Sequence, residues 1–175
     1  MMPAPKILLR AAIAAPILGI AAFAAVPQPE AQVFSGHNSD APVDYAADRI
    51  ELQDRQDRVI LSGNVDVKQA ELRLRAARTV VNFTNAGALQ IQRITASGGV
   101  VVTRGSETAT GDVGIYDFNQ KIITMTGNAT IKRANGDTLR GGRLVVDLKS
   151  GVSSASGGKG GRVSGTFSVP KQSGN

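Results

Sequence analysis

One pattern occurs three times along the chain, and this repetition constrains the fold more than any other feature. In each copy, a run of alternating apolar and polar residues is interrupted by a glycine-containing pair: Gly63-Asn64, Gly98-Gly99 or Gly127-Asn128. Alternation with a period of two is typical of β-strands, and such pairs indicate tight turns, or bulges that re-aim a strand. Because a single copy is too short to bury its own apolar face, we expect the copies to stack on one another.

A second alternating block follows each copy, at residues 74–82, 109–117 and 139–147. When the copies are aligned, apolar residues coincide on one face and polar residues on the other, which predicts one buried and one solvated sheet face. We therefore expect an all-β, mainly antiparallel body with an apolar interior that runs along the stack. The predicted polar face comprises Asp66, Lys68, Arg75, Asn82, Asp117, Arg140 and Asp147.

The two ends of the chain differ from the repeats. Lys6 and Arg10 precede an apolar run at residues 11–25 that contains an Ala-Phe-Ala cleavage pattern. The run is shorter than a membrane span, so we predict a cleaved secretory signal peptide rather than a retained anchor. The predicted segments are a signal peptide at 1–24, a flexible leader at 25–40, a β-domain at 41–149, a Ser/Gly-rich linker at 150–161, a terminal edge strand at 162–170 and a flexible tail at 171–175.

The charge balance and the scarcity of reactive side chains exclude several classes of function. The 20 Lys and Arg residues exceed the 14 Asp and Glu residues, but the excess lies at the two ends, so no nucleic-acid-binding face is expected. The chain has no Cys and a single His, His37, which we interpret as an incidental polar residue of the leader. Asp112, Asp117 and Asp147 could suggest a pair of catalytic carboxylates. However, Asp117 and Asp147 occupy equivalent repeat positions on the predicted polar face, which favours a structural role. We therefore expect no metal site, no cofactor and no enzymatic activity.

Several of these segments resemble a known family. The resemblance spans about residues 40–170 and implies an open, twisted antiparallel β-jellyroll built from repeated strand units, without catalytic residues. The chain departs from the family pattern at residues 105–114 and in its long Ser/Gly segment. The segments that resemble the OstA-like module of lipopolysaccharide-transport proteins are residues 42–48, 59–69, 123–131, 141–146 and 159–163, together with Val169-Pro170.

The resemblance also implies a function. Members of this kind are periplasmic bridge proteins that carry lipopolysaccharide from the inner to the outer membrane, with lipid A acyl chains held in an apolar groove. The implied partners are lipopolysaccharide, further copies of the chain stacked head to tail, an inner-membrane lipopolysaccharide-transport complex and an outer-membrane translocon. The residues predicted to line the groove are Val43, Leu61, Val67, Leu74, Val81, Phe83, Val102, Tyr116, Phe118, Ile131 and Val146. The residues predicted to form the stacking edges are Val43, Tyr45, Arg162, Val163, Phe167 and Val169.

Other interpretations of the same residues stay open. The apolar residues would also suit the core of a closed sandwich, in which they only pack against one another. A retained N-terminal anchor would make the chain a membrane-anchored lipopolysaccharide-transfer subunit. A structural or polysaccharide-binding β-repeat protein is a further alternative, although aromatic platforms for sugar rings are few. Arg73, Arg75 and Arg78 are interpreted as a solvated strand face, the alternative being contact with lipid phosphates.

Overall fold

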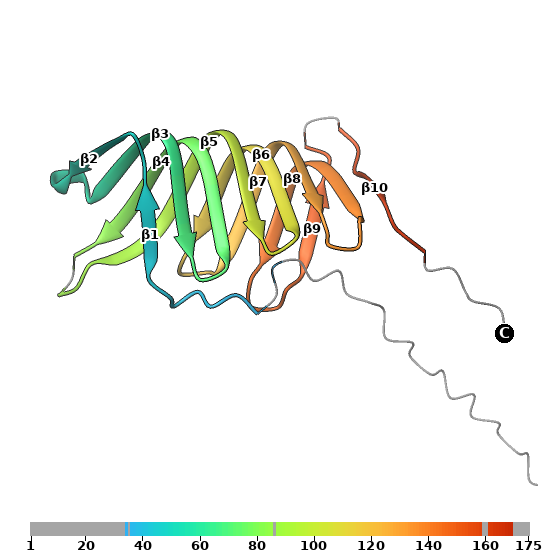
Figure 1. The fold of residues 1–175 in the computed structure, drawn as a ribbon, viewed down its shortest axis with the longest axis horizontal. Helices are drawn as coiled ribbons and strands as arrows, with labels where there is room; N and C mark the ends of the chain where they lie inside the picture. Colours follow the sequence, from blue (N-terminus) through green and yellow to red (C-terminus); the bar gives the residue numbers. More distant parts are fainter. Residues whose placement is uncertain (1–33, 35, 86, 159–160, 170–175) are drawn as a thin grey trace, which may run out of the picture.

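The computed structural model describes residues 34, 36–85, 87–158 and 161–169, and in these residues the chain is all-β. The strands form one open, antiparallel sheet (Figure 1). The predicted signal peptide at 1–24 lies outside the described residues. The strands are β1 (Val43–Ala46), β2 (Arg49–Gln53), β3 (Arg58–Gln69), β4 (Leu72–Thr84), β5 (Gln90–Arg104), β6 (Glu107–Asp117), β7 (Ile122–Lys132), β8 (Thr138–Asp147), β9 (Ser153–Ser156) and β10 (Ser164–Thr166), with one short 3-10 helix, η1 (Asp54–Gln56).

The long strands β3 to β8 each pass through two halves of the sheet. The pairing register shifts in the middle of every successive pair, for example between Ser62 and Val65 in β3 and between Thr126 and Ala129 in β7. Such bulges bend a strand, and here they lie side by side across the sheet. One half is bordered by β1 and β10, and the other by β2 and β9. We call them the β1–β10 half and the β2–β9 half.

The two halves face each other across a common core. The long strands arch over the bend, which runs along the upper side of the body in Figure 1. Val67 and Val102 of the β1–β10 half belong to the same buried cluster as Leu61, Met125 and Val146 of the β2–β9 half. The stacked repeats therefore form an open jellyroll whose inner faces are apolar, as the alternation predicts.

The glycine-containing pairs are bulges within strands. Gly63 and Asn64 both have positive φ, at 77° and 44°, and Gly127 and Asn128 have φ of 73° and 49°. Glycine adopts this left-handed backbone without steric cost, and asparagine tolerates it better than most residues. Of the two structures that the sequence allows at these pairs, a tight turn or a bulge, the fold contains the bulge.

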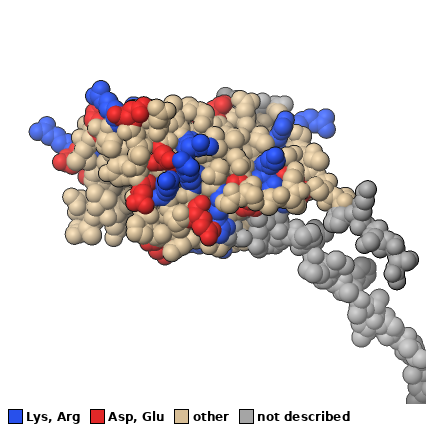
Figure 2. Space-filling view, viewed as in Figure 1, with Lys and Arg blue, Asp and Glu red and all other residues tan. Residues whose placement is uncertain are grey.

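Charged and polar side chains cover the outer face. Each residue of the predicted polar face is at least partly exposed. Figure 2 shows Lys and Arg interspersed with Asp and Glu on the face in view, rather than gathered into one basic patch. On β3 and β4, the Arg73 side chain binds Asp66 through two hydrogen bonds and holds the pKa of that carboxyl below its usual value.

The structure differs from the prediction within three of the predicted segments. The Ser/Gly-rich linker at 150–161 contains a strand, β9, which pairs with β8. Its small residues permit a close approach of two backbones, because a Cβ at Gly142 would lie 2.6 Å from the carbonyl oxygen of Gly157. The terminal strand at 162–170 is shorter than predicted and is limited to β10. Beyond β10, the Ser168 backbone N–H donates a hydrogen bond to the Asp137 carboxylate in the β7–β8 turn. The described part of the leader, Phe34 and residues 36–40, packs against the body through contacts distant in sequence, which a local pattern does not reveal.

Candidate functional site

An apolar gap separates the two halves of the sheet in the interior. It is lined almost entirely by apolar side chains, and its free volume is about 20 Å³, far below the roughly 300–1,000 Å³ of a typical ligand site. The β1–β10 half contributes Val67 and Val102, and the β2–β9 half contributes Ile94, Tyr116 and Ile123. Both halves are needed to build the gap, so it is a product of the bend rather than of any single strand.

All eleven residues predicted to line a groove are buried or half-buried. Six of them line the gap, and the other five lie elsewhere in the interior, so their contact with a lipid stays a prediction. The six that line the gap are Val43, Val67, Leu74, Val102, Tyr116 and Phe118. The five others are Leu61, Val81, Phe83, Ile131 and Val146.

Sequence reasoning missed several lining residues. Ile94, Ile123 and Met125 line the gap, and each of them coincides with an apolar residue of another repeat copy, so alignment of the copies contained the signal. Leu72 also lines the gap and lies on the same strand face as Leu74, so the alternation of β4 could have identified it. Gln69 carried no such signal, because a polar residue at the end of a strand gives no reason to expect an inward side chain.

The gap is narrow in this conformation. Little more than about one water molecule fits between the lining side chains. The rings of Tyr116 and Phe118 stack with centroids 4.1 Å apart and fill part of the space. Burial raises the pKa of the Tyr116 phenol, which is therefore neutral at physiological pH. An acyl chain would require the surrounding side chains or segments to move.

The acidic residues considered as a catalytic pair have structural roles. The Asp117 carboxylate accepts the backbone N–H groups of Asn119 and Gln120 in the β6–β7 turn. Asp147 accepts equivalent hydrogen bonds in the turn that follows β8, and in both cases these bonds lower the pKa of the carboxyl. Asp112 accepts a hydrogen bond from the Asn128 side chain at a bulge. In the described part of the chain, no group of His, Asp and Glu side chains is arranged to hold a metal ion.

The three arginines of β4 do not line the gap. Arg73 binds Asp66 on the outer face, and the Arg78 side chain donates a hydrogen bond to the Ser62 hydroxyl at 3.4 Å. Arg75 is exposed on the same face. The arrangement agrees with a solvated strand face, and it places these charges outside the apolar interior.

Exposed apolar residues gather at the two ends of the sheet. Tyr45 of β1 is paired with Val67, and Ile50 of β2 is paired with Leu61, so both continue the inner face, yet each is at least half exposed. The interior therefore reaches the surface at the β1–β2 end. At the other end, the residues predicted as an edge flank β10 rather than belong to it, and the exposed apolar ones are Val163, Phe167 and Val169.

The comparisons with known proteins agree with this architecture. The model of a family described as "LptA/(LptD N-terminal domain) LPS transport protein" matches residues 46–152. The chain belongs to this family. Its membership confirms the resemblance to lipopolysaccharide-transport proteins that the repeated motifs indicate. The match spans both halves of the sheet, from the end of β1 to the turn before β9.

Two relatives of this LptA/LptD-type chain extend the comparison. An uncharacterized protein of Rhizobium meliloti (strain 1021) is 28% identical over 159 residues, which cover 85% of this chain and 86% of the relative. The crystal structure of LptH from Pseudomonas aeruginosa, described as the LptA homologous periplasmic component of the lipopolysaccharide transport device, superimposes with a TM-score of 0.67. The superposition covers 76% of this chain and 99% of LptH at 18% identity, and it confirms the jellyroll fold. Among the described residues, no helix is long and apolar enough to cross a membrane.

Proposed function

We propose that this chain is a periplasmic carrier that holds the acyl chains of lipopolysaccharide between the two halves of its sheet. The observation that carries the proposal is the continuous apolar interior, which both halves line and which reaches the surface at the β1–β2 end. Membership of a lipopolysaccharide-transport family supports the same ligand. The ligand would enter as flexible hydrocarbon, which an aliphatic lining accommodates without directional contacts.

The energetics of acyl burial suit such a lining. Each CH₂ group transferred from water to an apolar environment stabilises the complex by about 0.8 kcal/mol. A lining of Val, Leu and Ile side chains imposes no fixed geometry on the lipid, so a chain can slide along it. The outer face, with its ion pairs, stays solvated and gives the carrier a water-compatible surface.

The periplasmic location is part of the proposal. LptH is described as a periplasmic component, and the N-terminal sequence has the features of a cleaved export signal. The alternative is a membrane-anchored transfer subunit that keeps this segment. The mass of the mature protein separates the two, because a cleaved chain would begin near residue 25.

We also propose that copies of the chain stack head to tail, and that the stack connects an inner-membrane transport complex with an outer-membrane translocon. Both ends of the sheet have unpaired strand edges, which favour pairing with another edge. An interface between two different ends does not close on itself and produces a filament. In light scattering, Phe167→Asp should abolish the growth of apparent mass with concentration, whereas Leu89→Asp, an equally exposed apolar site in the β4–β5 loop, should not.

Photo-crosslinking tests the proposed lipid site. A benzophenone amino acid at Phe118 or at Val102, on the inner face, should capture lipopolysaccharide in cells. The matched control is the neighbouring Val101, which lies on the outer face of the same strand. Capture from Val101 alone, or recovery of the mature protein without lipopolysaccharide in mass spectra of co-purified lipid, would contradict the proposal.

A further inference from the structure

A segment before β1 crosses the open side of the jellyroll, opposite the bend. In Figure 1 it runs from β1 along the lower side of the body towards β9. Its contacts lie on both halves of the sheet. Gln69 at the end of β3 and Glu107 at the start of β6 belong to the β1–β10 half, whereas Lys121 lies in the β6–β7 turn of the β2–β9 half. We call Phe34 together with residues His37–Asp40 the strap.

Phe34 anchors one end of the strap. Its side chain has 0% exposure and belongs to the same buried cluster as the inner-face residues of both halves. Its backbone N–H donates a hydrogen bond of 3.0 Å to the Glu107 carboxylate. A phenylalanine that leaves water in this way contributes apolar burial of the kind that a bound acyl chain would contribute. The strap thus places hydrocarbon of the chain itself in the apolar interior.

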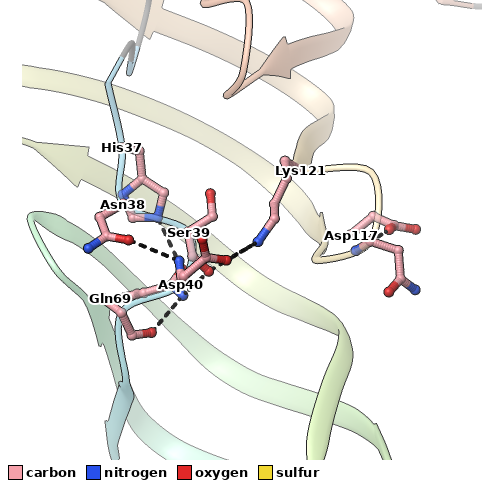
Figure 3. Close-up of polar contacts among 9 residues, drawn as sticks. His37, Asn38, Ser39, Asp40, Gln69, Asp117 and Lys121 are labelled. Atoms are coloured by element: carbon pink, nitrogen blue, oxygen red, sulfur yellow. Dashed lines mark hydrogen bonds and ion pairs between the residues drawn. The ribbon is translucent and has the colours of Figure 1, made fainter.

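The rest of the strap is held by polar contacts with Gln69 and Lys121, which we call the latch (Figure 3). The Gln69 amide donates to the carbonyl oxygens of Ser39 and Ala41, and its oxygen accepts a hydrogen bond of 3.0 Å from His37 Nε2. From the opposite half, Lys121 Nζ donates to the Ser39 carbonyl at 3.2 Å and to the Asp40 carboxylate at 3.0 Å. The strap is therefore hydrogen-bonded to both halves of the sheet. Gln69 belongs to the latch and also lines the gap.

Other features indicate that the latch can open. The Asp40 side chain is 91% exposed, so solvent screens its ion pair with Lys121. His37 Nδ1 is buried without a hydrogen-bond partner among the described residues, which is a cost of the closed arrangement. The His37 ring lies edge-on to Tyr116, with centroids 6.4 Å apart, and Tyr116 lines the gap. Movement of the strap would expose this part of the gap.

We propose that the strap closes the groove of the unloaded protein and must be displaced before an acyl chain enters. This inference rests on the proposed lipid-carrying function and adds a gate to the same site. The strap contacts two residues that line the gap, Gln69 and Tyr116, and so restrains this part of the lining while it is in place. Uptake then depends on the fraction of molecules in which the strap is open.

The Lys121–Asp40 contact offers a direct way to lock the strap. Among the ion pairs of the described residues, it is the one that joins a carboxylate to a lysine, whereas the others use arginine. A water-soluble carbodiimide would join Asp40 to Lys121 Nζ in an amide bond, and the water lost converts the carbodiimide to a urea. Peptide mass mapping would verify the bond. The control is Lys121→Arg, which keeps the positive charge but forms no such amide under the same treatment.

We expect the cross-linked, quenched protein to take up fluorescent lipopolysaccharide at least about tenfold more slowly than the untreated protein. Treated Lys121→Arg should keep the uptake rate of its untreated form. Conversely, Phe34→Asp should accelerate uptake, because the anchor is lost and a second carboxylate is placed beside Glu107. Leu89→Asp, which adds the same charge at an exposed apolar site, should not change the rate.

A small apolar dye that fluoresces in dry surroundings, N-phenyl-naphthylamine, separates the gate from the lipid function. If dye entry is slowed by the cross-link and accelerated by Phe34→Asp while no form binds lipopolysaccharide, the strap is confirmed and the proposed function is wrong. If lipopolysaccharide binds but neither its uptake nor dye entry responds to the two changes, the strap proposal is overturned and the function stands. Absence of dye entry in every form would also overturn the gate.

Discussion

The bend of the sheet is made in two chemical ways. At Gly63-Asn64 and Gly127-Asn128, the asparagine side chain donates a hydrogen bond to a carboxylate sixteen residues earlier. The acceptor is Asp48, between β1 and β2, in the first case and Asp112 of β6 in the second. At Gly98-Gly99 the corresponding residue is Ala77, whose methyl side chain cannot accept a hydrogen bond. We call the first two clamped bulges and the third a free bulge. All three pairs bend the backbone with positive φ, so the bulge does not require the hydrogen bond. The clamp is an additional contact at two of the three bulges.

The largest expected effect is a difference in stability between an alanine substitution at a clamped bulge, Gly127→Ala, and one at the free bulge, Gly99→Ala. Only at Gly127 would the new methyl group collide with a neighbouring side chain. In Gly127→Ala, the new Cβ would overlap the Asp112 carboxylate and also sit at a φ of 73°. We expect a loss of about 3 kcal/mol in the free energy of unfolding. In Gly99→Ala the φ is 66° but the space is open, so a loss of about 1 kcal/mol is expected from backbone strain alone. Urea unfolding measures both, and equal losses would show that the close approach at Asp112 has no energetic consequence.

Removal of the clamp should have a smaller effect. Asp112→Ala eliminates the hydrogen bond from Asn128, 3.2 Å long, and we expect a loss of about 1 kcal/mol. In the double variant with Gly127→Ala, about 1 kcal/mol of the steric cost should be recovered, because the carboxylate is gone while the Cβ at residue 112 stays. A double-mutant cycle measured by urea unfolding gives this coupling, and strict additivity would contradict the clamp.

The clamp should also be transferable. Ala77 holds the place at the free bulge that Asp48 and Asp112 hold at the clamped ones. The double variant Ala77→Asp with Gly99→Asn should therefore gain about 0.5–1 kcal/mol over Gly99→Asn alone. The midpoint of urea unfolding is the measurement. A destabilised double variant would show that the free bulge differs from the others in backbone geometry as well as in side chains.

The smallest expected effect compares the clamps with carboxylates that cap turns. Hydrogen bonds from the Gln120 backbone and from Arg93 hold the pKa of Asp117 below its ordinary value of 3.8. A carboxyl whose pKa is lower in the folded state stabilises the fold above the unfolded pKa, and this contribution is lost as the pH falls through the folded pKa. Asp117→Asn should flatten the decline in urea midpoint between about pH 5 and pH 2. An unchanged slope would exclude Asp117 as a source of acid sensitivity.

Much of the fold was predictable because it depends on short-range periodicity. Alternation identified the inner face, and alignment of the copies placed residues such as Val67, Val102 and Tyr116 together in the interior. The same reasoning could not decide which of them border a gap. That depends on small differences in side-chain packing, for example at Gly114, where Val100 packs so closely that an added Cβ would lie 2.9 Å from it.

The sequence by itself determined the all-β class, the family and the positions of the glycine-containing pairs that interrupt the alternation, because each follows from a local pattern repeated along the chain. Only the tertiary structure decided that the glycine-containing pairs lie within strands, since a bulge and a hairpin differ in which strand each arm pairs with. It also decided that a Ser/Gly run forms β9 and that Phe34 enters the core. These contacts join residues far apart in the chain. They depend on backbone pairing or on a single side chain, and neither produces a periodic pattern in the sequence.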